Sequence, residues 1–422
     1  MSVQPEDAWA EFRHAIGSAG VANATPADSL PGADPQVLLE PESAEGVAGA
    51  LRCASKSSLR VAPRGGGTKL GWGNPTHGAE LILSTLRLDQ VLEHASADMT
   101  ATVQAGCRIA RLQEVLAQHG QRLAIDPLWP ARATVGGILA TNDSGPLRVR
   151  FGSLRDLVIG ATVALADGTL ARSGGKVVKN VAGYDLPKLL TGSFGTLGVI
   201  VEATFRLHPL PKHSQTVSFA FPSFDEANRF TLAVLDSTLV STGLQVRAQR
   251  NARPIVDTRF EGVPTAAEAA VGRLASLSAN AEQLDPSADV WNLREGLWDE
   301  RSESIVCKFS VLPSALAAFS KSLDRTTAAH HLEWEMIGQA IGVGLLKLKG
   351  AHPDAYITPI HELRQNLAPG GGSLVVLDCP PEIKARVDAW GDAGDALPLM
   401  RRVKQQLDPA GILNPGRFVG GI

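Results

Sequence analysis

Cysteine is scarce in this sequence: four residues occur in a chain of 422, and they stand far apart. Cys53, Cys107, Cys307 and Cys379 form no C-x-x-C pair. Their spacing argues against a disulfide-stapled scaffold, a zinc ribbon and an iron–sulfur cluster built from this chain alone. Any redox chemistry must therefore use a bound cofactor.

A basic excess and a long apolar run are also missing. The chain has 40 Lys and Arg residues against 43 Asp and Glu residues, a formal net charge of −3. Without a block of Lys and Arg to hold a phosphate backbone, we expect no nucleic-acid partner. No stretch of about 18 apolar residues occurs, and the N-terminus lacks a basic region followed by an apolar one. We therefore expect a cytoplasmic chain with no membrane span.

Strand and helix patterns alternate along the chain, which predicts an α+β fold. A helical pattern leads into a short strand at 59–62, which we expect to end at Pro63. The dipeptide Asp167-Gly168 separates two alternating apolar segments, a hairpin pattern. With 44% apolar residues the chain can fill two cores. The predicted parts are an N-terminal helical segment (1–36), a cofactor-binding domain (37–211), a reduced α+β cap or substrate-like domain (212–398), and a C-terminal helix with a tail (399–422).

Three glycine-rich stretches lie beside predicted strands of the second part. They read "PRGGGTKLGWG" from Pro63, "TVGGILATNDSG" from Thr134 and "LTGSFGTLGVI" from Leu190. Backbone without Cβ atoms can turn several N–H groups toward one anion, and the first loop suits a diphosphate. Neither the P-loop spacing nor GxGxxG is present in it, so one loop alone could equally be a tight surface turn. Three such loops favour a large dinucleotide threaded along the fold.

These stretches, together with "FGSLRDLVIGATVALADG" and the terminal "LDPAGILNPGRF", resemble the vanillyl-alcohol oxidase/p-cresol methylhydroxylase flavoproteins. The resemblance covers nearly all of residues 37–210 and the last dozen or so. It implies a two-subdomain PCMH-type FAD-binding domain followed by a small α+β cap domain. The short second domain and "GYDLPKLLTGSFGTLGVI" most resemble the FAD-binding E subunits of bacterial glycolate oxidase (glycolate dehydrogenase).

The resemblance implies where FAD binds. The diphosphate would lie on the loop 64–69, and the segment 192–200 would lie near the diphosphate and the adenine. The segment 134–145 would line the ribityl and isoalloxazine side, and Asn414 would approach the flavin. The implied cofactor-binding residues are Pro63, Arg64, Gly65, Gly66, Gly67, Thr68, Lys69, Thr134, Gly136, Gly137, Asn142, Gly145, Gly192, Gly195, Gly198, Ile200 and Asn414. No His or Cys lies in the loop 64–73, so we expect non-covalent FAD.

Departures from the family pattern bear on the chemistry. Related 2-hydroxy-acid dehydrogenases carry H-x-G-D-G-N-x-H and a downstream Glu-His pair, which resemble a metal and substrate-carboxylate site. Both are missing here, and no remaining histidine has metal-ligand spacing, so we expect no metal and assign no catalytic residue.

Two functions from different classes follow. The resemblance implies an FAD subunit that oxidises the small 2-hydroxy acid glycolate to glyoxylate and passes electrons to an iron–sulfur subunit. A larger homologous FAD subunit would complete this complex, whose partners would hold it at the inner face of the membrane. The alternative is a flavin-binding accessory or scaffold subunit without substrate chemistry; a stand-alone oxidase of another alcohol is a third interpretation.

Five other residues stand out. Trp291, Arg294 and Trp298 fall on one face of a predicted helix, a pattern more typical of a core stripe or subunit contact than of a substrate cage, although the Arg294 fork suits a carboxylate. Lys176 and Lys179 either border the cofactor pocket or are solvated.

Overall fold

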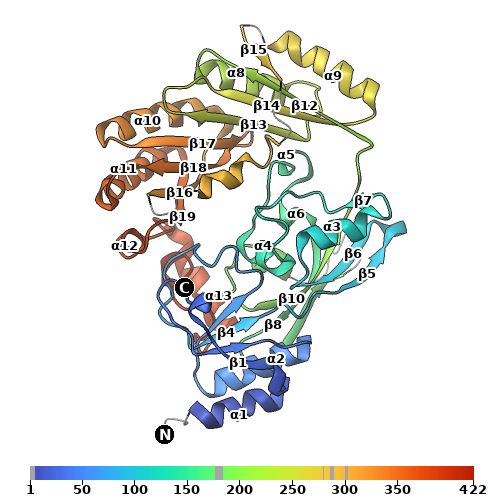
Figure 1. The fold of residues 1–422 in the computed structure, drawn as a ribbon, viewed down its shortest axis with the longest axis vertical. Coiled ribbons are helices and arrows are strands. Elements are labelled where there is room, and N and C mark those ends of the chain that lie inside the picture. The colour runs from blue at the N-terminus through green and yellow to red at the C-terminus, as the bar shows by residue number, and fades with distance from the viewer. Residues whose placement is uncertain (1–4, 176–183, 279, 286–288, 300–302) are drawn as a thin grey trace. The chain divides into compact units, whose positions relative to one another are not determined.

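The fold is described from a computed structural model of residues 5–175, 184–278, 280–285, 289–299 and 303–422 (Figure 1). The chain forms two compact units. Unit 1 contains residues 1–144, 153–210 and 392–422, and unit 2 contains residues 145–152 and 211–391. Helices and sheets occur in both units, which confirms the α+β fold class.

Unit 1 opens with a four-stranded sheet of order β1-β2-β4-β3. Its strands are β1 (Val21–Asn23), β2 (Val37–Leu39), β3 (Val61–Arg64) and β4 (Leu81–Ser84), accompanied by α1 (Pro5–Ile16) and α2 (Ala44–Lys56). Helix α2 begins where the side chain of Ser43 accepts a hydrogen bond from the amide of Gly46 at 3.0 Å. Strands β2 and β3 both run parallel to β4, so their carboxyl ends meet at one edge.

The strand predicted at 59–62 runs further than expected, through Pro63 to Arg64. Strand β3 is at the edge of its sheet. An edge strand tolerates a proline, which has no N–H to donate to a neighbouring strand. The glycine loop therefore starts directly at the carboxyl end of β3.

A five-stranded antiparallel sheet of order β5-β6-β10-β8-β9 forms the second part of unit 1. The strands are β5 (Val91–Ala95), β6 (Thr100–Gln104), β8 (Val158–Ala164), β9 (Leu170–Gly174) and β10 (Val199–Arg206); β7 (Gln121–Arg122) pairs separately with β11 (His208–Pro209). The helices are α3 (Ile109–Ala117), α4 (Val135–Thr141), α6 (Leu154–Leu157), α7 (Leu186–Leu190) and α13 (Leu397–Leu407). The predicted hairpin is confirmed, because β8 and β9 pair across a turn in which Gly168 has φ +83°.

Unit 2 is built on an eight-stranded antiparallel sheet of order β15-β12-β14-β13-β17-β18-β16-β19. The strands are β12 (His213–Ala220), β13 (Gly243–Gln249), β14 (Ile255–Gly262), β15 (Glu282–Leu284), β16 (Ser304–Ser310), β17 (Glu333–Gln339), β18 (Val343–Lys349) and β19 (Ser373–Asp378). The helices are α5 (Arg148–Phe151), α8 (Phe224–Asp236), α9 (Pro264–Leu277), α10 (Leu316–Ala329), α11 (Ile357–Leu367) and α12 (Pro381–Lys384).

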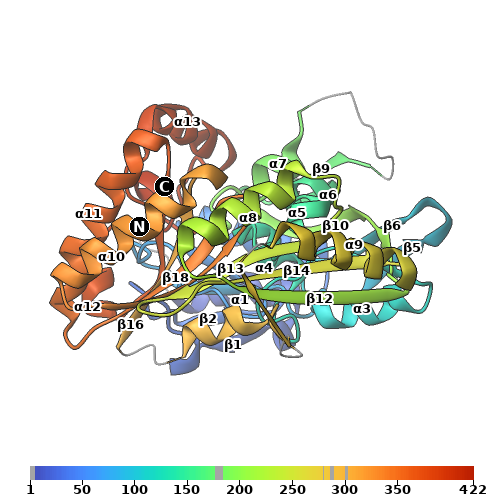
Figure 2. The same ribbon diagram turned by 90° about the horizontal axis from the view of Figure 1, so that it is seen from above.

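The two faces of the unit 2 sheet differ. Figure 2 shows α8, α9, α10 and α11 along the sheet, and apolar side chains at every second strand position form the core with them. On β13 these are Leu244 and Val246, whereas Gln245 and Arg247 point to the opposite face.

None of the described helices is long and apolar enough to cross a membrane.

A candidate cofactor pocket in unit 1

The first wall of the pocket is the loop after β3. Its glycines are required by a close approach to residues 132–134: a Cβ on Gly65 would lie 2.1 Å from Oγ1 of Thr134, and one on Gly66 would lie 1.9 Å from the carbonyl oxygen of Arg132. Of the three, only Gly67 has a positive φ, +71°. Packing, rather than backbone conformation, therefore demands glycine at 65 and 66.

The amides of this loop point to a ligand. Among the described residues, no oxygen atom accepts a hydrogen bond from the amides of residues 65–68. Gly65, Gly66 and Thr68 are half-buried, and Gly67 is exposed. Half-buried amides normally have partners, so this run of amides at a pocket wall suits the oxygens of an anion. The neighbouring strand β4 ends at the same edge and contributes Thr85 to the pocket.

The second wall is the start of α4. The helix begins at Thr134, whose hydroxyl accepts a hydrogen bond from the amide of Gly137 at 3.3 Å. Gly136 must be small because a Cβ there would lie 2.8 Å from Cβ of Ala105. Thr134, Gly136 and Gly137 thus reach the pocket because α4 packs closely on the segment after β6.

The third and fourth walls are the turn before β10 and the C-terminal strap, by which we mean residues 408–417. The amide of Phe194 donates to the carbonyl of Ala140 at 2.9 Å, which fixes the turn beside α4. The strap runs along β3: the amide of Val61 donates to Ile412 at 2.8 Å, and the amide of Asn414 donates back to Val61 at 2.9 Å.

Together the four walls enclose a pocket with about 740 Å³ of empty space, its open mouth included. Fourteen of the seventeen predicted cofactor residues line it; Asn142 and Gly192 do not, and Gly145 belongs to unit 2, whereas all lining residues belong to unit 1. The lining residues that the sequence interpretation missed are Leu70, Thr85, Ala140, Thr141, Ser193, Phe194, Val199 and Arg417. Most of them are direct chain neighbours of predicted residues, and Arg417 stands in the same "ILNPGRF" as Asn414, so the motifs themselves were the available signal.

Both cations of the glycine loop are paired with carboxylates. The Arg64 guanidinium contacts Asp28, and Nζ of Lys69 lies 3.0 Å from Oδ2 of Asp143, with side-chain exposures of only 5% and 7%. Nζ of Lys69 also lies 5.6 and 5.5 Å from the ring centroids of Trp72 and Trp129. The loop therefore offers a ligand its amides, while these two side chains anchor it to the protein.

Arg417 contributes a different kind of cation. Its guanidinium is buried and donates to the backbone carbonyls of Lys69, Leu70 and Trp72 at 3.1, 2.6 and 3.2 Å. Burial lowers the pKa of Arg417 to about 10. Because it bonds to the loop and lines the pocket, Arg417 ties the strap to the glycine loop.

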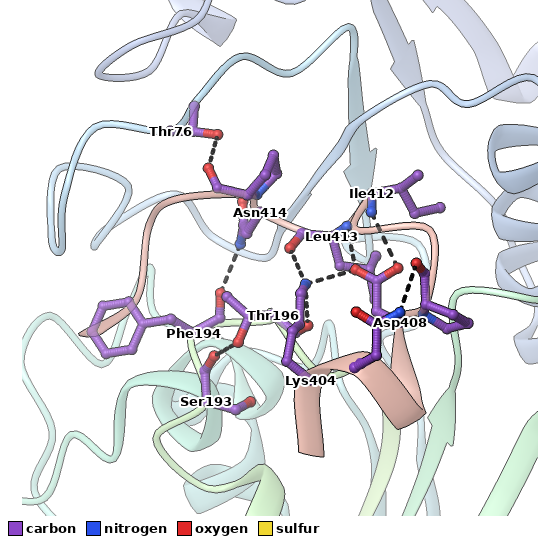
Figure 3. A network of polar contacts seen from close by, with 12 residues as sticks. Thr76, Ser193, Phe194, Thr196, Lys404, Asp408, Ile412, Leu413 and Asn414 are labelled. Carbon is purple, nitrogen blue, oxygen red and sulfur yellow. Dashed lines mark hydrogen bonds and ion pairs between the residues drawn. The ribbon is translucent and has the colours of Figure 1, made fainter. Parts of the chain in front are cut away.

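Asn414 supplies the remaining polar group. Its Nδ2 donates to the carbonyl of Phe194 at 2.7 Å (Figure 3), and its side chain is 1% exposed. No donor among the described residues reaches its buried Oδ1. A buried acceptor without a partner is costly, so a ligand donor at this position would stabilise it. Bare amides at one wall and a buried acceptor at another fit a ligand with both anionic and donor groups, such as FAD.

Unit 2 carries a polar layer that the sequence interpretation missed. On the face of its sheet opposite the main helices, the Arg247 guanidinium donates to Asp257 at 2.6 and 3.0 Å, and Arg259 lies 4.6 Å from the ring centroid of Trp291. Gln245 is fully buried and donates to the same carboxylate at 2.9 Å. The signal was present as polar residues at every second position of "GLQVRAQ" and "IVDTRFEG".

The helical stripe predicted at 291–298 is corrected by the structure. A 3₁₀ helix covers only Leu293–Trp298, and Trp291 precedes it, donating from Nε1 to Oγ1 of Thr216 at 3.0 Å. Arg294 is 5% exposed, and its carboxylate-binding role stays a prediction. Lys176 and Lys179 lie outside the described residues. Within the described ranges there is no group of three or more His, Cys, Asp or Glu that could hold a metal ion.

Two family models match this chain, mostly over residues of unit 1. Residues 35–174 match the FAD binding domain, and residues 391–418 match the C-terminal domain of FAD linked oxidases. The two matches contain the glycine loop, α4 and the strap, which are three of the four pocket walls. FAD is thus the cofactor of this chain, and the matches support an FAD-linked oxidase.

Curated relatives extend the likeness. The chain is 28% identical to D-2-hydroxyglutarate dehydrogenase of Xanthomonas citri pv. viticola over 91% of its length and 89% of the relative's. It is 29% identical to D-lactate dehydrogenase of Archaeoglobus fulgidus over 91% of each chain. It is 33% identical to glycolate oxidase subunit GlcD of Bacillus subtilis, over 56% of this chain and 50% of that one.

Solved structures show the same fold. p-Cresol methylhydroxylase with substrate bound has a TM-score of 0.78, with 14% identity, over 98% of this chain and 96% of that one. An alkyldihydroxyacetonephosphate synthase has a TM-score of 0.77, with 19% identity, over 99% and 86%. At these identities the likeness concerns the fold alone, and it confirms the expected PCMH-type architecture.

Proposed function

We propose that this chain is an FAD-dependent oxidoreductase of 2-hydroxy acids that works as the FAD-binding subunit of a glycolate-oxidising complex. The observation that carries the proposal is the pocket. Its amides without partners lie in residues that match an FAD binding domain, and the buried acceptor of Asn414 lies in residues that match the C-terminal domain of FAD linked oxidases. Support for the substrate class comes from relatives named for 2-hydroxyglutarate, lactate and glycolate, all of which are 2-hydroxy carboxylates.

In this proposal each wall of the pocket has one task. The amides of the loop 65–68 bind the diphosphate, because a backbone cradle can surround an anion without a side-chain cation. Asn414 and the turn at Phe194 hold the other polar groups of FAD, which we propose is bound without a covalent link. Held by these residues, FAD would supply the hydride acceptor for oxidation of a 2-hydroxy acid at C2, and the hydroxyl proton would have to leave to a base. In the proposed complex, a partner iron–sulfur subunit at the cytoplasmic face of the membrane would receive the electrons.

The test is reduction of the bound flavin. The purified chain is mixed anaerobically with glycolate, D-lactate or D-2-hydroxyglutarate, and bleaching of the visible flavin band is followed. Glycolamide is the matched control, because it keeps the hydroxyl group and lacks the carboxylate. Bleaching by glycolate and not by glycolamide is expected in the co-expressed complex. No bleaching by any of the acids, alone or with partner subunits, would contradict the proposal.

One observation favours the accessory function. No residue lining the described pocket carries a carboxylate, an imidazole or a phenol. These side chains are common general bases, and the described pocket offers none of them to accept the hydroxyl proton of the substrate. An accessory subunit would retain FAD and yet show no bleaching by any hydroxy acid in the isolated chain. If the complex turns over glycolate while this flavin stays oxidised throughout, the accessory function replaces the first one.

A further inference from the structure

A buried ion pair lies behind the C-terminal wall of the pocket. Lys404 stands in the last turn of α13, and Asp408 follows the end of that helix. Nζ of Lys404 is 2.6 Å from Oδ2 of Asp408, with side-chain exposures of 12% and 0%. Neither residue lines the pocket. Two charges withdrawn this far from water need good local partners to be tolerated.

Lys404 has an acceptor for each of its three protons. Besides Asp408, its ammonium donates to the carbonyl of Thr196 at 2.7 Å and to that of Leu413 at 2.9 Å (Figure 3). Thr196 belongs to the turn before β10, and Leu413 belongs to the strap. A single side chain on α13 therefore cross-links two of the four pocket walls.

Asp408 fixes the same strap through its backbone amides. Oδ1 accepts a hydrogen bond from the amide of Ile412 at 3.1 Å, and Oδ2 accepts one from Leu413 at 2.8 Å. The backbone turn that these bonds close includes Gly411, with φ +65°. It delivers the next residue, Asn414, to the position where it meets Phe194.

An apolar side chain could not replace this pair. Without the ammonium, the carbonyls of Thr196 and Leu413 would each lose a donor, and the Asp408 carboxylate would be buried without its cation. Burial lowers the pKa of Lys404, and the neighbouring carboxylate opposes that shift. The pair is thus costly to build into a surface helix, which points to a task beyond joining α13 to the unit.

We propose that Lys404 and Asp408 are positioning residues that latch the C-terminal strap, so that the docked strap and bound FAD stabilise each other. They act through Asn414 and Arg417, the two strap residues that line the pocket. Releasing the latch would withdraw both of them from the cofactor at once. The inference concerns FAD retention alone and holds whatever the substrate is, so it can fail independently of the proposed function.

The first test measures FAD release from the holoprotein. Lys404→Met keeps an unbranched side chain, one atom shorter, and removes its charge. After dilution, the rise of free-flavin fluorescence gives the release rate, which we expect to increase about tenfold or more, in line with breaking one side of a buried pair. Lys404→Arg, which keeps the charge, should recover part of the loss. Arg402→Met, on the exposed side of the same helix, is the matched control and should release FAD at the wild-type rate.

The second test needs no variant and decides the matter if Lys404→Met does not fold. Amide hydrogen exchange of Leu413, whose N–H is bonded to Asp408, is measured in the wild-type holoprotein at increasing excess of free FAD. If strap opening and FAD release are coupled, exchange should slow roughly in proportion to the excess. Amides of β18 in unit 2 serve as the reference. Exchange at Leu413 that ignores free FAD, or a Lys404→Met protein that releases FAD like Arg402→Met, would overturn the proposal.

Discussion

Replacing Gly66 by alanine should abolish tight FAD binding while leaving the fold intact. The added Cβ would lie 1.9 Å from the carbonyl oxygen of Arg132, whereas real Cβ contacts stay beyond 3.0 Å. The loop must therefore retreat by about 1 Å, since both the oxygen and its carbonyl carbon are backbone atoms that cannot rotate away. A shift of that size stretches a hydrogen bond from about 2.9 Å to about 3.9 Å, beyond the bonding range.

The magnitude follows from the number of amides displaced. Hydrogen bonds to a charged group contribute about 1.5–3 kcal/mol each, so losing two of them from residues 65–68 weakens binding by about 3–6 kcal/mol. At about 1.4 kcal/mol per factor of ten, the dissociation constant should rise roughly 10²- to 10⁴-fold.

The assay is FAD titration of the flavin-depleted chain, followed by flavin fluorescence, with far-UV circular dichroism to confirm folding. Gly67→Ala is the matched control: its Cβ would meet only ordinary contacts, the nearest being Cδ1 of Leu70 at 3.7 Å, and its cost comes from φ +71° alone. That conformation costs alanine about 1–2 kcal/mol, so the effect on FAD should be smaller. A folded Gly66→Ala chain that binds FAD as tightly as wild type would refute the role of the loop.

Three further predictions concern the pocket and its supports. No His, Cys or Tyr lines the described pocket, so acid precipitation should leave all flavin in the supernatant, and colour in the pellet would contradict a non-covalent link. Asn414→Ala should raise the FAD dissociation constant about tenfold by removing an acceptor, whereas equal affinity would mean that its Oδ1 meets no ligand donor. Burial by itself would raise the pKa of Asp28, but hydrogen bonds from Thr25 and Arg64 lower it overall below 3.8. The contribution of Asp28 to stability is therefore present above pH 3.8 and disappears as pH falls through the lowered pKa. The difference in urea unfolding free energy between wild type and Asp28→Asn should shrink as the pH falls through this range. A difference that stays constant would contradict the linkage.

The glycine stretches could be identified without coordinates because bare backbone is visible as letters. Three consecutive glycines after a strand, a Gly-Gly pair after a short apolar run and glycines spaced three apart predicted the segments that line the pocket. The reason given for one of them was incomplete: Gly66 is needed for its approach to Arg132, which lies 66 positions away. The letters show that a side chain is missing, and they do not show which distant atom requires its absence.

What the sequence by itself determined was therefore local: the α+β elements, the 167–168 hairpin and the segments that line the pocket. Only the tertiary structure decided the partners of the charges, namely Asp28 for Arg64, Asp143 for Lys69 and the carbonyls of Thr196 and Leu413 for Lys404. Spacing along a strand or helix specifies which residues share a face, because it follows from backbone periodicity. Pairs between segments far apart in the chain depend on how whole sheets and loops pack, and no local pattern encodes that packing.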